Sequence, residues 1–144
     1  MALAGRALVH LRHALHYLAK QGAASPYRVL TFSHPDIIAT RQKLVEMFGP
    51  AVASISARPD SDKTIEWHKV GGMLTEVVDT EAFFWSLGCG FEAIDLTEGR
   101  GGEHLHDLSN PLPERFVGKY DLVYDNITHQ CFNIGQAWAN MINA

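Results

Sequence analysis

The stretch YDLVYDNITHQCFN, residues 120–133, decides the fold that the sequence predicts. Leu122, Val123 and Tyr124 have the apolar and aromatic character of a short buried strand. A run of hydrogen-bonding side chains follows at once: Asp125, Asn126, Thr128, His129 and Gln130. A second apolar segment with helical spacing comes next. A strand that runs into a polar turn and then a helix is typical of an open α/β sheet, where ligands bind at the carboxyl ends of strands.

Length and composition predict a single globular domain over residues 1–144. The chain is 47% hydrophobic and 19% charged, which is typical of a chain that buries a core rather than a disordered one. The net charge is −4 and the basic residues are scattered, so nothing predicts a nucleic-acid partner.

The N-terminal segment, residues 1–24, predicts an amphipathic helix over about residues 3–20. Leu8, Leu11, Leu15 and Leu18 recur at helical spacing. Charged and histidine residues interrupt every apolar run, which predicts neither a signal peptide nor a membrane span. Two cysteines far apart in sequence, Cys89 and Cys131, are interpreted as reduced thiols, and the sequence predicts a cytoplasmic protein.

Strand and helix patterns alternate along the rest of the chain, residues 26–144. Strands are expected at 29–32, 51–57, 91–95, 104–107 and 120–125, and helices at about 37–48, 81–88 and 132–144. A turn is expected at 33–36, and the polar segment 57–64 is expected to be the most flexible part of the chain. This alternation predicts an α/β fold with a mostly parallel, Rossmann-like sheet flanked by helices, plus the extra N-terminal helix.

Three acidic residues stand at the ends of three predicted strands: Asp95, Asp107 and Asp125. Because the carboxyl ends of parallel strands lie on one edge of a sheet, these side chains are expected to line one crevice. Such carboxylates can accept hydrogen bonds from ribose hydroxyls or from an adenine amine. The alternative is that each Asp caps a helix or a turn.

The run from GFEAIDL to the last helix, about residues 88–143, resembles class I S-adenosylmethionine-dependent methyltransferases. The resemblance implies that Asp95 and Leu96 contact the ribose, that Asp107 and Leu108 contact the adenine, and that Asp125 faces the methyl donor. It extends more loosely to YRVLTFSHPDI, where Ser33 stands in the cofactor-binding first turn. The implied cofactor is S-adenosylmethionine, and the methyl acceptor is not identified.

A methyltransferase of this kind needs a group that orients the acceptor or removes its proton. The resemblance makes His129 and Asn126 the candidate catalytic residues. Histidine has an unperturbed pKa near neutrality, which suits a base. The alternative for His129 is a cap on the last helix or a hydrogen bond to a nearby carbonyl.

The sequence departs from the family pattern in three places, one of which is a long interval between the first strand and GFEAIDL that predicts an inserted segment around residues 51–80. The first turn reads Thr31-Phe32-Ser33-His34-Pro35, where the family has glycines that let the backbone approach the cofactor. The chain ends after the fourth helix, whereas the family fold continues through three more strands. We therefore expect an incomplete sheet with strand 120–125 as an open edge. A fragment, self-association or a partner chain that covers this edge, or a fold that no longer catalyses would each account for it.

Two further hypotheses concern a metal site and a non-catalytic function. His104 and His106 at i, i+2 could hold a metal with one more ligand, but no third ligand is fixed by spacing and no metal site is predicted. The alternative function is a non-catalytic derivative of the methyltransferase fold that acts as an oligomeric structural or binding subunit.

Overall fold

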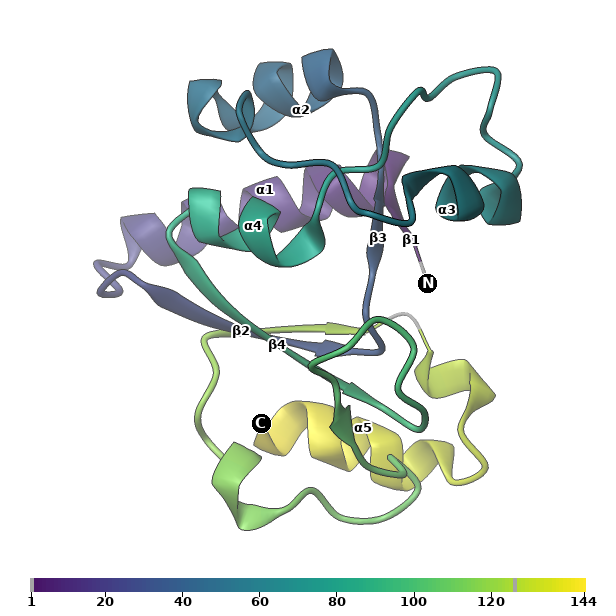
Figure 1. The fold of residues 1–144 in the computed structure, drawn as a ribbon. Coiled ribbons are helices and arrows are strands. Elements are labelled where there is room, and N and C mark those ends of the chain that lie inside the picture. Colours follow the sequence, from purple (N-terminus) through teal and green to yellow (C-terminus); the bar gives the residue numbers. More distant parts are fainter. Residues whose placement is uncertain (1, 126) are drawn as a thin grey trace. The chain divides into compact units, whose positions relative to one another are not determined.

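A computed structural model describes residues 2–125 and 127–144 and has an α/β architecture (Figure 1). The chain divides into two compact units. Unit 1 consists of residues 25–34 and 90–144, and unit 2 consists of residues 2–24 and 35–89. Within the described residues, the helices are too short or too polar to cross a lipid bilayer.

Unit 1 is built on a four-stranded sheet. Its strands are β2 (Tyr27–Phe32), β4 (Cys89–Asp95), β5 (His104–Leu105) and β6 (Leu122–Asp125), in the hydrogen-bonded order β5-β4-β2-β6. The β2/β6 and β4/β5 pairs are both parallel, as the alternation of strands and helices predicts. The predicted strands at 29–32, 91–95 and 120–125 are confirmed, each with a shift of two residues at its first end and none at its last.

Helix α5 (Ile134–Asn143) packs against this sheet in the lower part of Figure 1 and completes the core of unit 1. Two short 3₁₀ turns, η2 (Glu114–Phe116) and η3 (Thr128–Gln130), lie on either side of β6 in the chain. The core cluster joins residues from β2, β4, α5 and the 108–116 segment: Leu30, Phe32, Ile94, Leu108, Leu112, Phe116, Ala137 and Ala144. The predicted final helix is therefore confirmed, and its apolar spacing serves burial.

Unit 2 contains most of the helices. They are α1 (Gly5–Lys20), α2 (Arg41–Phe48), α3 (Ser61–His68) and α4 (Thr80–Ser86). A short parallel pair, β1 (Ala2–Ala4) with β3 (Asp36–Ile38), joins the start of the chain to the segment after β2. The N-terminal helix is confirmed, but the residues before it are a strand, and part of the expected turn 33–36 opens strand β3.

The strand predicted over 51–57 is wrong. The chain forms a 3₁₀ turn, η1 (Pro50–Val52), and only Ala57 joins an isolated bridge, to Val78. Pro50 has no N–H to donate to a sheet, and it suits the first position of a helical turn. Val52 and Ile55 are both buried, and their spacing of three is helical rather than strand-like.

Candidate functional site at the carboxyl edge of the unit 1 sheet

The strand order of unit 1 defines one place where a crevice is expected. In chain order β2, β4, β5 and β6 are the first to fourth strands of the sheet, so the sheet reads 3-2-1-4. In doubly wound folds with this order, ligands bind outside the carboxyl ends of the two strands between which the order reverses. Those strands are β2 and β6, and their last residues, Phe32 and Asp125, are aligned in the parallel register.

Ser33 forms the first turn residue after β2, and its backbone is left-handed. Its φ of 69° is a value that glycine adopts freely and serine rarely does. The Ser33 N–H donates to the Ile94 carbonyl at 2.6 Å, which ties the turn to neighbouring strand β4. The chain thus has a left-handed residue in the first turn although it lacks the glycine that the methyltransferase resemblance leads one to expect.

Asp95 is the last residue of β4, and it is half-buried. Its Oδ1 accepts a hydrogen bond from the Leu96 N–H at 2.7 Å, and its carbonyl accepts one from His106 N–H at 2.9 Å. The Leu96 side chain is 68% exposed. Asp95 therefore turns the chain out of the strand, and Leu96 presents an apolar side chain at the edge of the sheet.

Asp107 follows β5 by two residues and is exposed. Its Oδ1 accepts from the Ser109 N–H at 2.8 Å, a turn geometry that aspartate favours. Leu108 differs from the other candidates because its side chain is buried in the core of unit 1. Its carbonyl accepts from the Asn140 side chain at 3.0 Å, so a role for Leu108 at an adenine remains a prediction that this burial does not favour.

Asp125 ends β6 and caps the η3 turn. Its Oδ1 accepts from the N–H groups of Ile127 and Thr128 at 3.0 and 2.9 Å. His129, within η3, is exposed, and its Nε2 lies 3.4 Å from the Gln130 Nε2. Asn126, the second candidate catalytic residue, lies outside the described residues. Of the two, His129 can therefore be placed, on the surface directly beyond the capped carboxylate.

The turns that carry Asp107 and Asp125 come together around Cys131. Partial burial, followed by the charges of Asp125 and then Asp107, raises the pKa of the Cys131 thiol. The Asn133 N–H donates to Ser109 Oγ at 3.2 Å, which links the turn after β5 to the start of α5. The two carboxylates that the sequence placed at separate strand ends therefore act on one thiol.

Asn140 is a supporting residue that the sequence analysis missed. It is 1% exposed, and all of its amide is used. Nδ2 donates to the carbonyls of Leu108 and Asn110, while Oδ1 accepts from the Leu112 N–H and from Gln136 Nε2, at 2.8–3.1 Å. One side chain of α5 thus holds the segment that follows Asp107. Asn140 lies three residues after the apolar Ala137, on the same side of the helix, and this spacing could have indicated from the sequence that it is buried.

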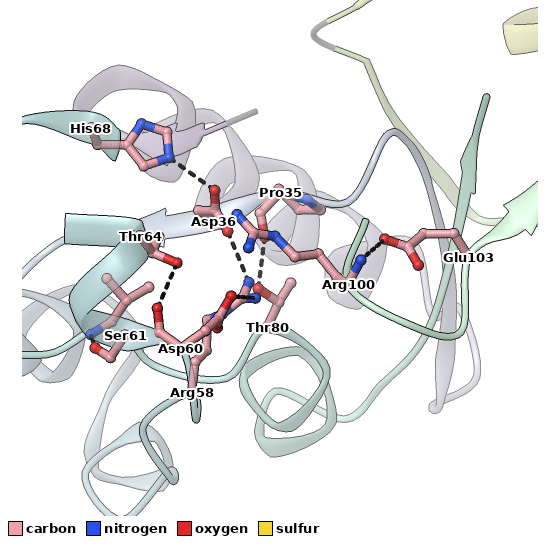
Figure 2. Close-up of polar contacts among 11 residues, drawn as sticks. Pro35, Asp36, Arg58, Asp60, Ser61, Thr64, His68, Thr80, Arg100 and Glu103 are labelled. Atoms are coloured by element: carbon pink, nitrogen blue, oxygen red, sulfur yellow. Dashed lines mark hydrogen bonds and ion pairs between the residues drawn. The ribbon is translucent and has the colours of Figure 1, made fainter. Parts of the chain in front are cut away.

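A second missed cluster lies in unit 2 and was expected to be a flexible loop (Figure 2). Asp36, 1% exposed, accepts from Arg58 at 2.8 Å and bonds His68 Nε2 at 2.8 Å, and Arg58 also contacts Asp60 at 2.8 Å. The Thr64 hydroxyl extends the network to the Asp60 carbonyl. The network holds Arg58, Asp60 and Thr64 in place, so it anchors segment 58–64, while Pro59, Asp62 and Lys63 in the same segment are exposed.

The metal hypothesis finds no support in the contacts of His104. Its Nε2 is 2.9 Å from Glu92 Oε2 and its Nδ1 is 3.4 Å from an Arg115 nitrogen. Both ring nitrogens therefore face protein groups. Among residues 2–125 and 127–144, no group of three His, Cys, Asp or Glu side chains has a metal-binding arrangement.

Comparison of the chain with protein-family models, with curated proteins and with solved structures gives no match. The methyltransferase resemblance thus rests on the residues quoted above, and the strand order of unit 1 is compatible with a Rossmann-like sheet.

Proposed function

We propose that unit 1 binds S-adenosylmethionine at the carboxyl edge of its sheet, as a methyltransferase-like domain whose methyl acceptor is not identified. The observation that carries the proposal is the 3-2-1-4 strand order, with Asp95 ending β4 and Asp125 ending β6. Nucleotide-containing ligands bind at such an edge in doubly wound folds, and an acid at the end of the second strand is suited to the two ribose hydroxyls.

The hydrogen bonds at the edge leave acceptor capacity for a ligand. In Asp95, Asp107 and Asp125 one carboxylate oxygen, Oδ1, accepts from the backbone, and this fixes the orientation of the group. A carboxylate has about four lone-pair sites, so a second oxygen remains able to accept from hydroxyl or amine groups. The capping role and the binding role are therefore compatible at these positions.

Methyl transfer from S-adenosylmethionine requires little covalent chemistry from the protein, because the sulfonium methyl group is already activated. The acceptor must lie in line with the sulfonium methyl group, and its proton must leave. His129 is our candidate for the group that takes this proton or orients the acceptor, since it is exposed beside the capped Asp125.

A non-catalytic derivative of the fold is the second candidate. It is favoured by the first turn, where Ser33 and the fully buried Phe32 stand in place of a glycine-rich loop. In that case the carboxylates would serve only as caps, and the sheet would be kept for assembly.

Calorimetric titration of the chain with S-adenosylmethionine and S-adenosylhomocysteine tests the proposal. Asp95→Asn keeps an oxygen for the Leu96 N–H but removes the charge, and hydrogen bonds to a charged group contribute about 1.5–3 kcal/mol each. We expect Asp95→Asn to weaken binding by about 10- to 100-fold. Asp62→Asn, an exposed change in α3, is the matched control and should bind normally. A folded wild-type chain that releases no heat with either compound would refute cofactor binding and favour the second candidate.

A further inference from the structure

Helix α5 carries an exposed apolar stripe that the proposed function does not use. Ile134, Trp138 and Ile142 follow each other at i, i+4 and i+8, with exposed fractions of 42%, 57% and 81%. Residues four apart lie on one side of a helix, so the three form a continuous row. Phe132, just before the helix, is fully exposed. We call these four residues the α5 stripe.

The segment that carries the α5 stripe has no formal charge. Residues 126–144 contain no Asp, Glu, Lys or Arg, although the chain has 28 such residues elsewhere (12 basic and 16 acidic). An exposed helix in a monomer normally carries charged residues on its outer face, whereas the centres of protein interfaces are depleted of charge and enriched in Trp, Phe and Met. The composition therefore points to a surface that another protein covers.

The α5 stripe lies on the β6 side of unit 1. Each residue turns an α-helix by about 100°, so Asn140 and Trp138 point to nearly opposite flanks. Asn140 binds the segment that follows β5, one of the two outer strands of the sheet, and β6 is the other outer strand. Trp138, on the opposite flank of the helix, therefore lies toward β6. The carbonyls of Asn143 and Ala144 also accept from Gly118, Lys119 and Tyr120, which lead into β6.

Strand β6 offers an unpaired edge on that same side. It is the last strand in the hydrogen-bonded order, and among the described residues no further strand pairs with it. An open strand edge is a template for pairing with another chain. Leu122, Val123 and Tyr124 carry no charge, and Asp125, the last residue of β6, is the one charged side chain of the strand.

We propose that a second copy of this chain covers both features, with the two β6 strands paired antiparallel across a twofold axis and the two α5 stripes packed together. In a twofold interface the same patch meets itself, and side chains at the axis face their own copies, so a charge there would face a like charge. A charge-free stripe removes this repulsion and makes the surface self-complementary. Pairing of the two edges would continue the sheets of two unit 1 cores into one.

Sedimentation equilibrium of the full chain tests the proposal. We expect the mass to rise with concentration from 16.0 kDa toward that of two chains. Trp138→Lys should raise the dissociation constant by about 30-fold or more, because central aromatic residues dominate interface energies. Trp67→Lys is the matched control, since Trp67 is 77% exposed but lies on α3. The far-ultraviolet circular dichroism of both variants should match wild type, because neither side chain belongs to a core cluster.

Hydrogen exchange separates the strand contact from a helix contact alone. In the wild-type chain the outward amides of β6 should gain protection as concentration rises, and in Trp138→Lys they should not. A wild-type chain that stays monomeric at every concentration would overturn the proposal. So would a dimer that persists equally in Trp138→Lys and Ile142→Lys, or a dimer in which β6 exchange is independent of concentration. None of these outcomes depends on S-adenosylmethionine binding.

Discussion

Replacing Asn140 with alanine should destabilise unit 1 more than any other single change of a polar residue in α5. The substitution removes both donors and the acceptor that hold the segment after Asp107. Leu108 and Leu112 are 4% and 9% exposed, so the Leu108 carbonyl and the Leu112 N–H would lose their partners away from bulk water. Asn110 is exposed, and water can replace the bond to its carbonyl.

The expected magnitude follows from these two buried backbone groups. A buried donor or acceptor left without a partner costs about 1–3 kcal/mol, so two cost about 2–6 kcal/mol. Domains of this size are stable by about 5–15 kcal/mol in total. A loss of about 4 kcal/mol, at a urea dependence of about 2 kcal/mol per molar, lowers the unfolding midpoint by about 2 M.

Urea unfolding followed by tryptophan fluorescence measures this loss in unit 1 alone, provided that Trp67 and Trp85 of unit 2 are first replaced by Phe. Trp138 then reports on α5. Gln136→Ala is the control, because it removes only the side-chain bond from Gln136 to Asn140 and should cost about 0.5–1.5 kcal/mol. An Asn140→Ala variant within about 1 kcal/mol of the wild type would refute the view that this amide anchors the segment.

Three further changes test other parts of the molecule. Asp36→Ala leaves Arg58 and His68 without their shared buried partner and should cost unit 2 about 3–5 kcal/mol in urea unfolding, whereas Glu46→Ala in an exposed pair should cost less than about 1 kcal/mol. Ser33→Val should destabilise the chain by about 1–2 kcal/mol, because a β-branched residue resists the left-handed backbone, and Ser33→Gly should not. Burial, then the charge of Glu92, raises the pKa of Tyr120 from 10.0 to about 12. Between pH 10 and 12 the tyrosine hydroxyl therefore stays protonated in the folded chain but ionises in the unfolded chain, so the free energy of unfolding should fall as pH rises through this range. An ultraviolet titration in which Tyr120→Phe removes no late-ionising tyrosine would contradict this.

Much of unit 1 could be predicted from local patterns. Strands β2, β4 and β6 are apolar runs whose length and composition suit a parallel sheet, and their alternation with helical segments indicates the layer order. The helix over 132–144 followed from its spacing. What the sequence could not supply was the sheet order, because register and neighbour choice depend on contacts between distant segments.

Unit 2 was harder to predict for a physical reason. Strand β3 begins with the charged Asp36, followed by the apolar Ile37 and Ile38. An aspartate in such a position indicates a turn unless the residues that bind its carboxylate are known. Those partners, Arg58 and His68, come from 22 and 32 residues away. Because these contacts between distant residues cannot be seen in the sequence, the polar segment 57–64 was predicted to be a flexible loop.

The candidate site was predictable in its residue types but not in its detail. Aspartates at strand ends predict a polar edge, and Asp95 and Asp125 do end their strands. That each Oδ1 is occupied by a backbone N–H depends on the local turn geometry. The burial of Leu108 follows from α5, which approaches it only in the folded chain.

The division into two units gives the chain a definite order of assembly. Unit 2 takes residues 2–24 and 35–89, and strand β2 lies between these two stretches. During synthesis from the N-terminus, unit 2 can close once residue 89 has left the ribosome, whereas β2 gains its neighbour β4 only with residues 90–95 and its neighbour β6 only with residues 122–125. Nascent Val29, Leu30 and Phe32 therefore belong to a strand with one open edge until residues 122–125 have been made. Slow translation over residues 90–144 should prolong that interval and increase aggregation and chaperone demand.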